Sequence, residues 1–321
     1  MMESAAPPPR RKLISIVTPC YNEEGNLANH FARVCAAIEP FREKYDFEHI
    51  YTDNCSQDQT FQLLVELGGR HKNVKAIRFS RNIGANRAIF MGLMQAKGDA
   101  AILIQADLQD PPELIPDFIR GWEEGYDVVY GQIKSRREPF IIRNLRRTYY
   151  KIIAKLADVT PPQNAGEFRL TSRRVLDAIR LYSEDDLYLR GAVAHIGYRQ
   201  KALAYDRAAR VAGKSNAGLF HLIGYALNGL ISTSTVAPIR AVTLLGFLTS
   251  LTGFAFAVYV VVAKLLWPSE VPHGISLILA VVTSLAGIQM LSLGVIGEYI
   301  RKIYIQSLQR PPGFIQDKVN L

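Results

Sequence analysis

Residues 100–113 read Ala-Ala-Ile-Leu-Ile-Gln-Ala-Asp-Leu-Gln-Asp-Pro-Pro-Glu, an apolar run followed by a polar one. An uncharged run such as residues 100–104 is typical of a β-strand buried on both faces of a sheet. Asp110 as N-cap and Glu113 as the closing residue of a capping box predict that a helix starts directly afterwards. Asp107 lies between strand and helix without a local structural task, so it is the first candidate for a functional carboxylate.

The same pattern occurs three times upstream. The apolar run 13–18 is followed by Asn22, 47–52 by Asp53, and 74–79 by Asn82, with helical periodicity between the runs. Such alternation predicts an α/β fold with a mostly parallel sheet flanked by helices, and ligands then bind beyond the carboxyl ends of the strands. No G-x-G-x-x-G follows the first run and no P-loop sequence occurs, which argues against dinucleotide and P-loop sites.

Composition and hydropathy divide the chain into segments. The 321 residues carry a net charge of +9, and 49% of them are hydrophobic, a share that argues against a disordered protein. Residues 241–263 and 271–297 contain no Asp, Glu, Lys or Arg, and each is long enough to cross a bilayer as a helix. Arg240, Arg301 and Lys302 flank these segments and place both termini in the cytoplasm by the positive-inside rule.

We therefore expect a cytoplasmic head on a transmembrane hairpin, and we exclude a purely cytosolic enzyme. The expected segments are a flexible basic tail at 1–12, the head at 13–215, interfacial amphipathic helices at 216–238, two transmembrane helices at 239–300 and a cytoplasmic tail at 301–321. A core helix of the head is the alternative reading of the amphipathic segment. Three cysteines without a C-x-x-C pair predict neither disulfides nor structural zinc.

Several polar residues carry chemical hypotheses. Asp107 is predicted to hold a divalent cation through oxygen, with Gln109 and Gln105 as neutral oxygen ligands; the alternative is a plain loop aspartate. Asp53 is predicted to accept a hydrogen bond from a nucleobase. Pro19 and Tyr21 are candidates for an apolar wall against that base.

A basic run follows the fifth predicted strand, 127–130. Its members are Lys134, Arg136, Arg137, Arg143, Arg146, Arg147 and Lys151. A lipid phosphate or the anionic lipid of the inner leaflet is the favoured partner, because arginine binds phosphate bidentately; a solvated face is the alternative, and no nucleic acid is expected. Glu167 and Arg169, in an apolar context, form either a catalytic pair or a buried ion pair.

These motifs together resemble the family 2 glycosyltransferases of the GT-A fold. More narrowly, they resemble bacterial polyprenyl-phosphate glycosyltransferases, the bactoprenol glucosyltransferase group related to dolichol-phosphate mannose synthase. The matching stretches are Val17–Glu24, Asp53–Thr60, Ser80–Gly84, Ala106–Glu113, Ala165–Leu170 and Ser292–Tyr299. The resemblance implies a membrane enzyme of cell-envelope biogenesis in the bacterial cytoplasmic membrane. An enzyme of this kind is expected to transfer a sugar with inversion from a UDP-sugar, by default UDP-glucose, to a polyprenyl phosphate such as undecaprenyl phosphate.

The resemblance also implies roles for residues. Mg²⁺ or Mn²⁺ binds Asp107, Gln109 and Gln105, and catalysis involves Asp107, Glu167 and Arg169. The nucleotide-sugar site comprises Pro19, Tyr21, Glu23, Asp53, Arg81, Asn82, Gly84, Ala106 and Asp107. The acceptor phosphate binds Arg136, Arg137, Arg143, Arg146, Arg210 and Lys214.

Three positions depart from the family pattern. Gln105 replaces the first aspartate of Asp-x-Asp, Glu167 stands where many relatives have aspartate, and Asn54-Cys55 replaces Asp-Gly. A processive or other family 2 membrane glycosyltransferase and a catalytically silent scaffold in lipid-glycan assembly are the alternative functions. A homo-oligomer is compatible with the glycines of the two apolar segments.

Overall fold

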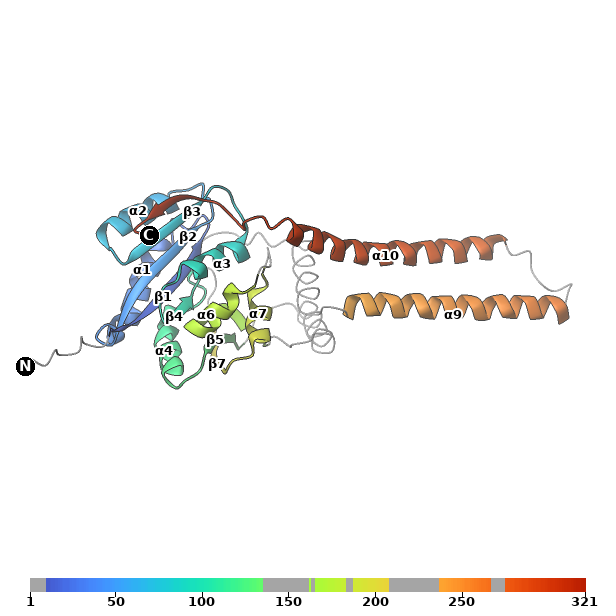
Figure 1. Cartoon of the computed structure of the whole chain (residues 1–321), viewed down its shortest axis with the longest axis horizontal. Coiled ribbons are helices and arrows are strands. Elements are labelled where there is room, and N and C mark those ends of the chain that lie inside the picture. Colours follow the sequence, from blue (N-terminus) through green and yellow to red (C-terminus); the bar gives the residue numbers. More distant parts are fainter. Residues whose placement is uncertain (1–9, 135–161, 163–164, 183–186, 208–236, 267–274) are drawn as a thin grey trace, which may run out of the picture.

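The structure is a computed structural model that describes residues 10–134, 162, 165–182, 187–207, 237–266 and 275–321. The N-terminal part of the chain forms most of an α/β head, and two long helices extend from this head side by side (Figure 1). The predicted α/β fold class is confirmed for the head.

The head is built on one eight-stranded sheet. Its strands are β1 (Lys12–Cys20), β2 (Tyr45–Asp53), β3 (Val74–Phe79), β4 (Ala100–Leu103), β5 (Val128–Ile133), β6 (Ala165–Ser172), β7 (Gln200–Tyr205) and β8 (Ile315–Val319), in the order β7-β5-β6-β4-β1-β2-β3-β8. Only β6 and β8 run opposite to the others in this sheet, so it is mostly parallel as predicted. We call the edge where β1–β5 and β7 end, and where β6 and β8 begin, the carboxyl edge.

Helices cover both faces of the sheet. Those of the head are α1 (Leu27–Ile38), α2 (Thr60–Arg70), α3 (Ala85–Gln95), α4 (Ile115–Glu123), α6 (Arg173–Arg180) and α7 (Leu189–Ile196), with 3-10 turns at Glu39–Phe41 and Pro112–Leu114. The two long helices are α9 (Ala237–Leu266) and α10 (Ile275–Ser307).

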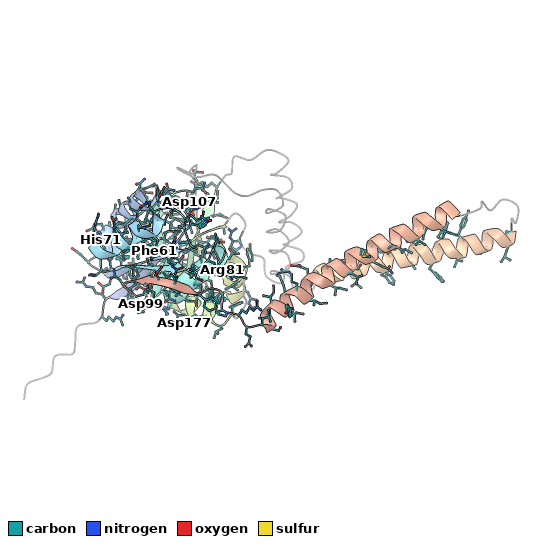
Figure 2. All side chains as sticks on the ribbon, turned by 90° about the horizontal axis from the view of Figure 1, so that it is seen from above. Phe61, His71, Arg81, Asp99, Asp107 and Asp177 are labelled. Atoms are coloured by element: carbon teal, nitrogen blue, oxygen red, sulfur yellow. The ribbon has the colours of Figure 1, made fainter. Side chains whose placement is uncertain are left out.

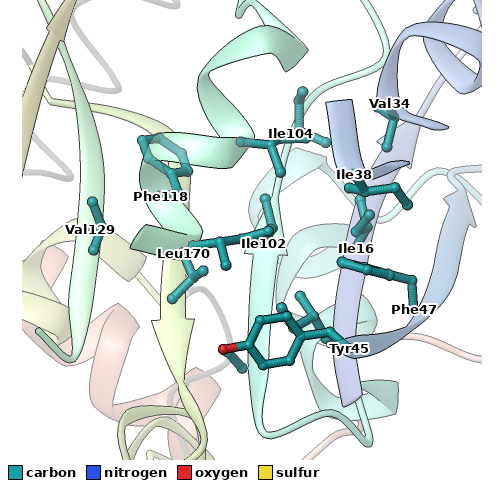
Figure 3. Packing of buried hydrophobic residues seen from close by; sticks show 14 of the residues in the cluster. Ile16, Val34, Ile38, Tyr45, Phe47, Ile102, Ile104, Phe118, Val129 and Leu170 are labelled. Carbon is teal, nitrogen blue, oxygen red and sulfur yellow. The ribbon is translucent and has the colours of Figure 1, made fainter. Parts of the chain in front are cut away.

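Alternate side chains of the central strands fill two separate cores. Ile16 and Ile102 pack with Val34, Ile38 and Phe118 from α1 and α4 on one face (Figure 3). Val17 and Leu103 pack on the other face with residues of α3 and α6. Successive side chains of a strand point to opposite faces, so the uncharged run at residues 100–104 is buried on both sides as expected. Each fully buried aliphatic side chain contributes about 1.5–3 kcal/mol.

The C-terminal segment differs from the expected tail. Helix α10 continues to Ser307, and residues 315–319 form β8, which pairs antiparallel with β3. Asn320 Nδ2 donates to the carbonyl oxygens of Gly68 and Val74, both at 2.8 Å. The segment thus covers an edge strand whose backbone groups would otherwise lack partners.

The two long helices occupy the region predicted to span the membrane. Among the residues that the structure describes, no helix is long and apolar enough to cross a membrane. The predicted interfacial helices at 216–238 lie outside the described residues, apart from the start of α9 at Ala237.

Two histidines are buried between α1 and the sheet. In the described part of the chain, neither ring nitrogen of His30 or His49 has a hydrogen-bond partner. Burial, with a smaller effect of Arg33, lowers the pKa of His30 from 6.5 to about 4. Burial lowers the pKa of His49 to about 3, aided by the charges of His30, Arg42 and His71. Both imidazoles are therefore neutral in the folded protein at pH 7.

We expect the free energy of unfolding to fall as the pH drops from 7 to 4. The unfolded chain takes up protons on these histidines near pH 6.5, whereas the folded chain does so only near their lowered pKa values, so acid favours unfolding in this window. For His30 alone the loss is about 3 kcal/mol. The free energy of unfolding, measured with urea at several pH values, should fall less steeply towards acid pH in His30→Leu than in the wild-type protein. His195→Leu is the control, because His195 is exposed. Equal slopes for all three proteins contradict the prediction.

Candidate functional site

The loops that follow β1 and β2 are locked together at the carboxyl edge. Asn22 N donates to Ser56 Oγ at 3.0 Å, and Gln57 N donates to Asn22 Oδ1 at 2.8 Å. Asn22, with a φ of 54°, therefore bridges the loops and does not cap α1, which begins only at Leu27. Because β1 and β2 pair in register at Cys20 and Asp53, these contacts bring the predicted Pro19, Tyr21, Glu23 and Asp53 into one region.

Asp53 has a fully buried carboxylate at the end of β2. It accepts a hydrogen bond from Ser56 N at 3.3 Å and lies 3.4 Å from Arg78 Nε. Burial raises the pKa of Asp53 even though Ser56 and Arg78 stabilise its charged form. Arg78, which stands opposite Asp53 in the β2–β3 register, was not among the predicted residues. The nucleobase contact of Asp53 stays a prediction.

The loop after β3 is tied to the loop after β2 by two asparagines. Asn54 Nδ2 donates to Asn82 Oδ1 at 3.0 Å, and Asn54 Oδ1 accepts from Ile83 N at 2.9 Å. Asn82 Oδ1 also accepts from Gly84 N at 3.0 Å, and Gly84 has a φ of +89°, which favours glycine. An aspartate at position 54 has no N–H to donate to Asn82. The departure at Asn54 thus serves this loop pairing, next to the predicted Arg81.

Asp107 lies in a tight turn at the end of the central strand β4. Its side chain is 4% exposed, and its Oδ1 accepts from Gln109 N at 3.2 Å. Leu108, with a φ of 57°, adopts the left-handed conformation that turns the chain back. Ala106 is buried, and Gln105 and Gln109 are half-buried. The carboxyl ends of β3 and β4 carry Arg81 and Asp107; Figure 2 shows Arg81 toward the long helices and His71, before β3, away from them.

Asp110 is not the helix cap that its sequence context predicts. The 3-10 turn begins at Pro112, and no side chain caps it. Asp110 is instead 2% exposed, accepts a hydrogen bond from Tyr205 Oη and lies 3.3 Å from Arg207 Nε. The predicted capping partner, Glu113, forms a two-point ion pair with Arg33 at 2.8 and 2.9 Å. Tertiary partners thus replace the local cap.

Asp110, Asp107 and Glu167 lie close enough to interact electrostatically. Burial raises the pKa of Asp110, and the charges of Asp107 and Glu167 raise it further, against the opposing effects of Arg207 and Tyr205. The carboxyl edge therefore brings together the carboxylates of Asp107 and Asp110, which follow β4, and of Glu167, which lies on β6.

Glu167 is held between two arginines. Arg190 Nε lies 2.5 Å from Glu167 Oε1, and Arg169 Nη2 lies 3.2 Å from Oε2. Burial opposes ionisation of Glu167, but Arg190 and Arg169 outweigh it and hold its pKa below the usual range. The sequence left open whether Glu167 and Arg169 are catalytic or a buried ion pair; the structure places them in an ion-paired cluster. Arg190, on α7, was missed because no local motif marks it.

The residues predicted to bind the acceptor phosphate belong to segments that the structure does not describe. Arg136, Arg137, Arg143, Arg146, Arg210 and Lys214 all lie outside the described residues.

The predicted metal ligands offer oxygen atoms only. Within the described residues, no three His, Cys, Asp or Glu side chains come together to hold a metal. Mg²⁺ commonly binds through one or two carboxylates and the phosphates of a substrate. The donor set of Asp107 with Gln109 and Gln105 fits an ion shared with a diphosphate, not an ion held by protein alone.

Comparison with known proteins identifies the family. The model of "Glycosyl transferase family 2" matches residues 15–180. The chain belongs to glycosyl transferase family 2. It is 36% identical over 305 residues to the uncharacterized glycosyltransferase sll0501 of Synechocystis, covering 95% of each chain. It is 33% identical to the bactoprenol glucosyl transferase of Shigella phage SfV, covering 95% of this chain and 98% of the relative.

Solved structures are more distant. The structure of the Pyrobaculum calidifontis mannosyltransferase PcManGT with GDP-Man and Mn²⁺ has a TM-score of 0.46 and 15% identity, covering 95% of this chain and 89% of that one. That of Staphylococcus aureus TarS 1-349 with UDP-GlcNAc has a TM-score of 0.44 and 18% identity, covering 68% of this chain and 67% of that one. The family membership makes this chain a glycosyltransferase, as the motifs predicted.

We expect Glu167→Gln to lower the free energy of unfolding at pH 7 by about 3 kcal/mol, because it removes the charge that pairs with the buried Arg169 and the half-buried Arg190. Since the pKa of Glu167 is lowered, its ion pairs stabilise the fold above the unfolded-state pKa of about 4.3 and are lost in acid as the carboxylate protonates. Urea unfolding measures both effects.

Asp177→Asn is the matched control, because Asp177 pairs with Arg180 at 2.8 Å and with Arg173 at 3.6 Å on the surface. An exposed pair contributes at most about 1 kcal/mol. If both variants lower the free energy of unfolding equally, the proposed contribution of the Glu167 ion pairs to stability is wrong.

Proposed function

We propose that this protein transfers a sugar, glucose by default, from a UDP-sugar to a polyprenyl phosphate such as undecaprenyl phosphate, with inversion at the anomeric carbon. Two observations together carry the proposal. The chain is similar over nearly its full length to bactoprenol glucosyl transferases, and a buried carboxylate, Asp107, lies at the carboxyl edge. The interlocked loops of Asn22, Asp53 and Asn82 lie at the same edge and supply the nucleotide side of the site.

The chain connections support a lipid acceptor. Strand β7 ends at the carboxyl edge before the chain enters α9, and β8 begins at that edge after the chain leaves α10. The strand before α9 and the strand after α10 therefore both have the end that is nearer to these helices in sequence at the edge of the sheet that also carries Asp107. An acceptor carried in a membrane beside these helices approaches the site from this edge.

We also propose that α9 and α10 associate with the bacterial cytoplasmic membrane, with the head on the cytoplasmic side. Large apolar side chains are exposed along both helices, among them Phe247, Phe254, Tyr259, Met290 and Leu293. Exposed apolar surface of this extent marks contact with lipid or with another protein. The basic residues Arg301 and Lys302 at the head-side end of the second apolar segment favour an anionic inner leaflet.

The chemistry requires charge balance more than proton transfer. A phosphate monoester has a second pKa near 6, so the acceptor is ionised at pH 7 and attacks without a general base. Glu167, held ionised by Arg169 and Arg190, serves in this scheme to orient these arginines toward anionic substrates. A divalent cation, Mg²⁺ or Mn²⁺, held by Asp107 with Gln109 and Gln105 would neutralise charge on the leaving diphosphate.

We expect Asp107→Asn to lower transfer by on the order of 10³-fold, because it removes the charged ligand at the leaving group. The measurement is mass-spectrometric detection of the glycolipid formed from undecaprenyl phosphate and a panel of nucleotide sugars, with and without Mn²⁺. Asp177→Asn on α6 is the control, because Asp177 is none of the proposed site residues and its ion pairs with Arg173 and Arg180 lie at the surface. Turnover near the wild-type level in Asp107→Asn refutes the metal role, and no UDP release by the wild-type protein refutes the transferase proposal.

We expect alanine at Arg136, Arg137, Arg143 or Arg146 to raise the KM for the lipid phosphate by roughly tenfold or more while the KM for the UDP-sugar stays within about twofold, since a charged hydrogen bond contributes about 1.5–3 kcal/mol. Steady-state kinetics with each substrate varied in turn separates the two constants. Equal increases in both would indicate a folding defect and remove the proposed acceptor role.

A further inference from the structure

The C-terminal end of the chain touches the loop that the nucleotide proposal uses. Phe314 O accepts a hydrogen bond from Ser80 N at 3.0 Å, just before β8 begins at Ile315. Ser80 is the first residue of the loop that carries Arg81, Asn82 and Gly84. The last strand of the sheet is therefore joined by its backbone to the start of that loop.

Side-chain packing strengthens the same contact. Ile83 is 5% exposed and forms a small core with Ile77, Phe79 and Ala88, against which Ile315 packs. A Cβ at Gly313 would lie 2.8 Å from Ile83 Cδ1 and 3.2 Å from its Cγ2. Such distances are shorter than van der Waals contact, so a larger residue at position 313 requires the Ile83 side chain to move.

Ile83 in turn connects this packing to the polar side of the loop. Its backbone N donates to Asn54 Oδ1, and Asn54 pairs with Asn82, which fixes Gly84. Gly313–Ile315 therefore contacts a loop whose other partner is the residue next to Asp53. We call Gly313–Ile315 the C-terminal clamp.

We propose that the C-terminal clamp is a positioning element of the nucleotide site: it holds residues 80–84 in the conformation that receives a uridine nucleotide. This rests on the proposed function for the identity of the nucleotide. It also links the long helices to the site, because five residues separate the end of α10 at Ser307 from Gly313. The clamp residues themselves do not touch the reacting atoms.

The test uses Gly313→Val in the full-length protein, with UDP as the probe. We expect the Kd for UDP, measured by calorimetry, to rise by roughly tenfold, and the amides of residues 80–84 to exchange roughly tenfold faster. In the transfer assay the KM for the UDP-sugar should rise while kcat and the KM for the lipid phosphate stay within about twofold. Adding Ile83→Ala to Gly313→Val removes the clashing side chain and should restore UDP binding to within about threefold of wild type.

Asn320→Ala is the matched control. It removes two hydrogen bonds at the far end of β8, so it should lower the thermal midpoint but leave UDP affinity and exchange at residues 80–84 within about twofold. The proposal is overturned if Asn320→Ala weakens UDP binding as much as Gly313→Val, or if Gly313→Val changes neither readout. A wild-type protein that binds no UDP refutes the proposed function alone, because hydrogen exchange at residues 80–84 still tests the clamp.

Discussion

Parallel pairing of the central strands is the constraint on which the site depends. Strands β4, β1, β2 and β3 pair side by side in one direction, so the loops that follow them emerge at one edge of the sheet. Residues as distant in sequence as Asn22, Asn82 and Asp107 are thereby collected without any of them being close along the chain. Burial of the strands on both faces fixes their register, because a shift by one residue would exchange the two cores.

Charge concentrated at that edge has to be compensated, and the protein does so with arginines. Asp53 has Arg78 from β3, Asp110 has Arg207 from the end of β7, and Glu167 has Arg169 and Arg190. Of these arginines, only Arg169 comes from the same strand as its carboxylate, Glu167. A buried carboxylate without a partner is costly, so each of these pairs also fixes the position of the element that brings the arginine. The contacts that compensate the buried carboxylates thus also hold the elements of the site together.

The sequence predicted what depends on local pattern and missed what depends on distant partners. The uncharged run at residues 100–104 predicted a doubly buried strand and therefore the place of Asp107. The capping signal at Asp110 was genuine but weaker than Tyr205 and Arg207, which lie almost a hundred residues away. Arg190 had no motif, and β8 is too polar a segment to predict a strand; only the open edge of β3 explains its position.

The same topology explains why the two edge strands, β7 and β8, flank the long helices in sequence. β7 closes one edge of the sheet and leads toward α9, whereas β8 closes the other edge and follows α10. Only five residues lie between the end of helix α10 and Gly313, and the next residue, Phe314, accepts a hydrogen bond from Ser80 at the start of the loop that holds Asn82. The part of the chain proposed to bind lipid is therefore followed directly by a segment that contacts the loop proposed to bind the nucleotide.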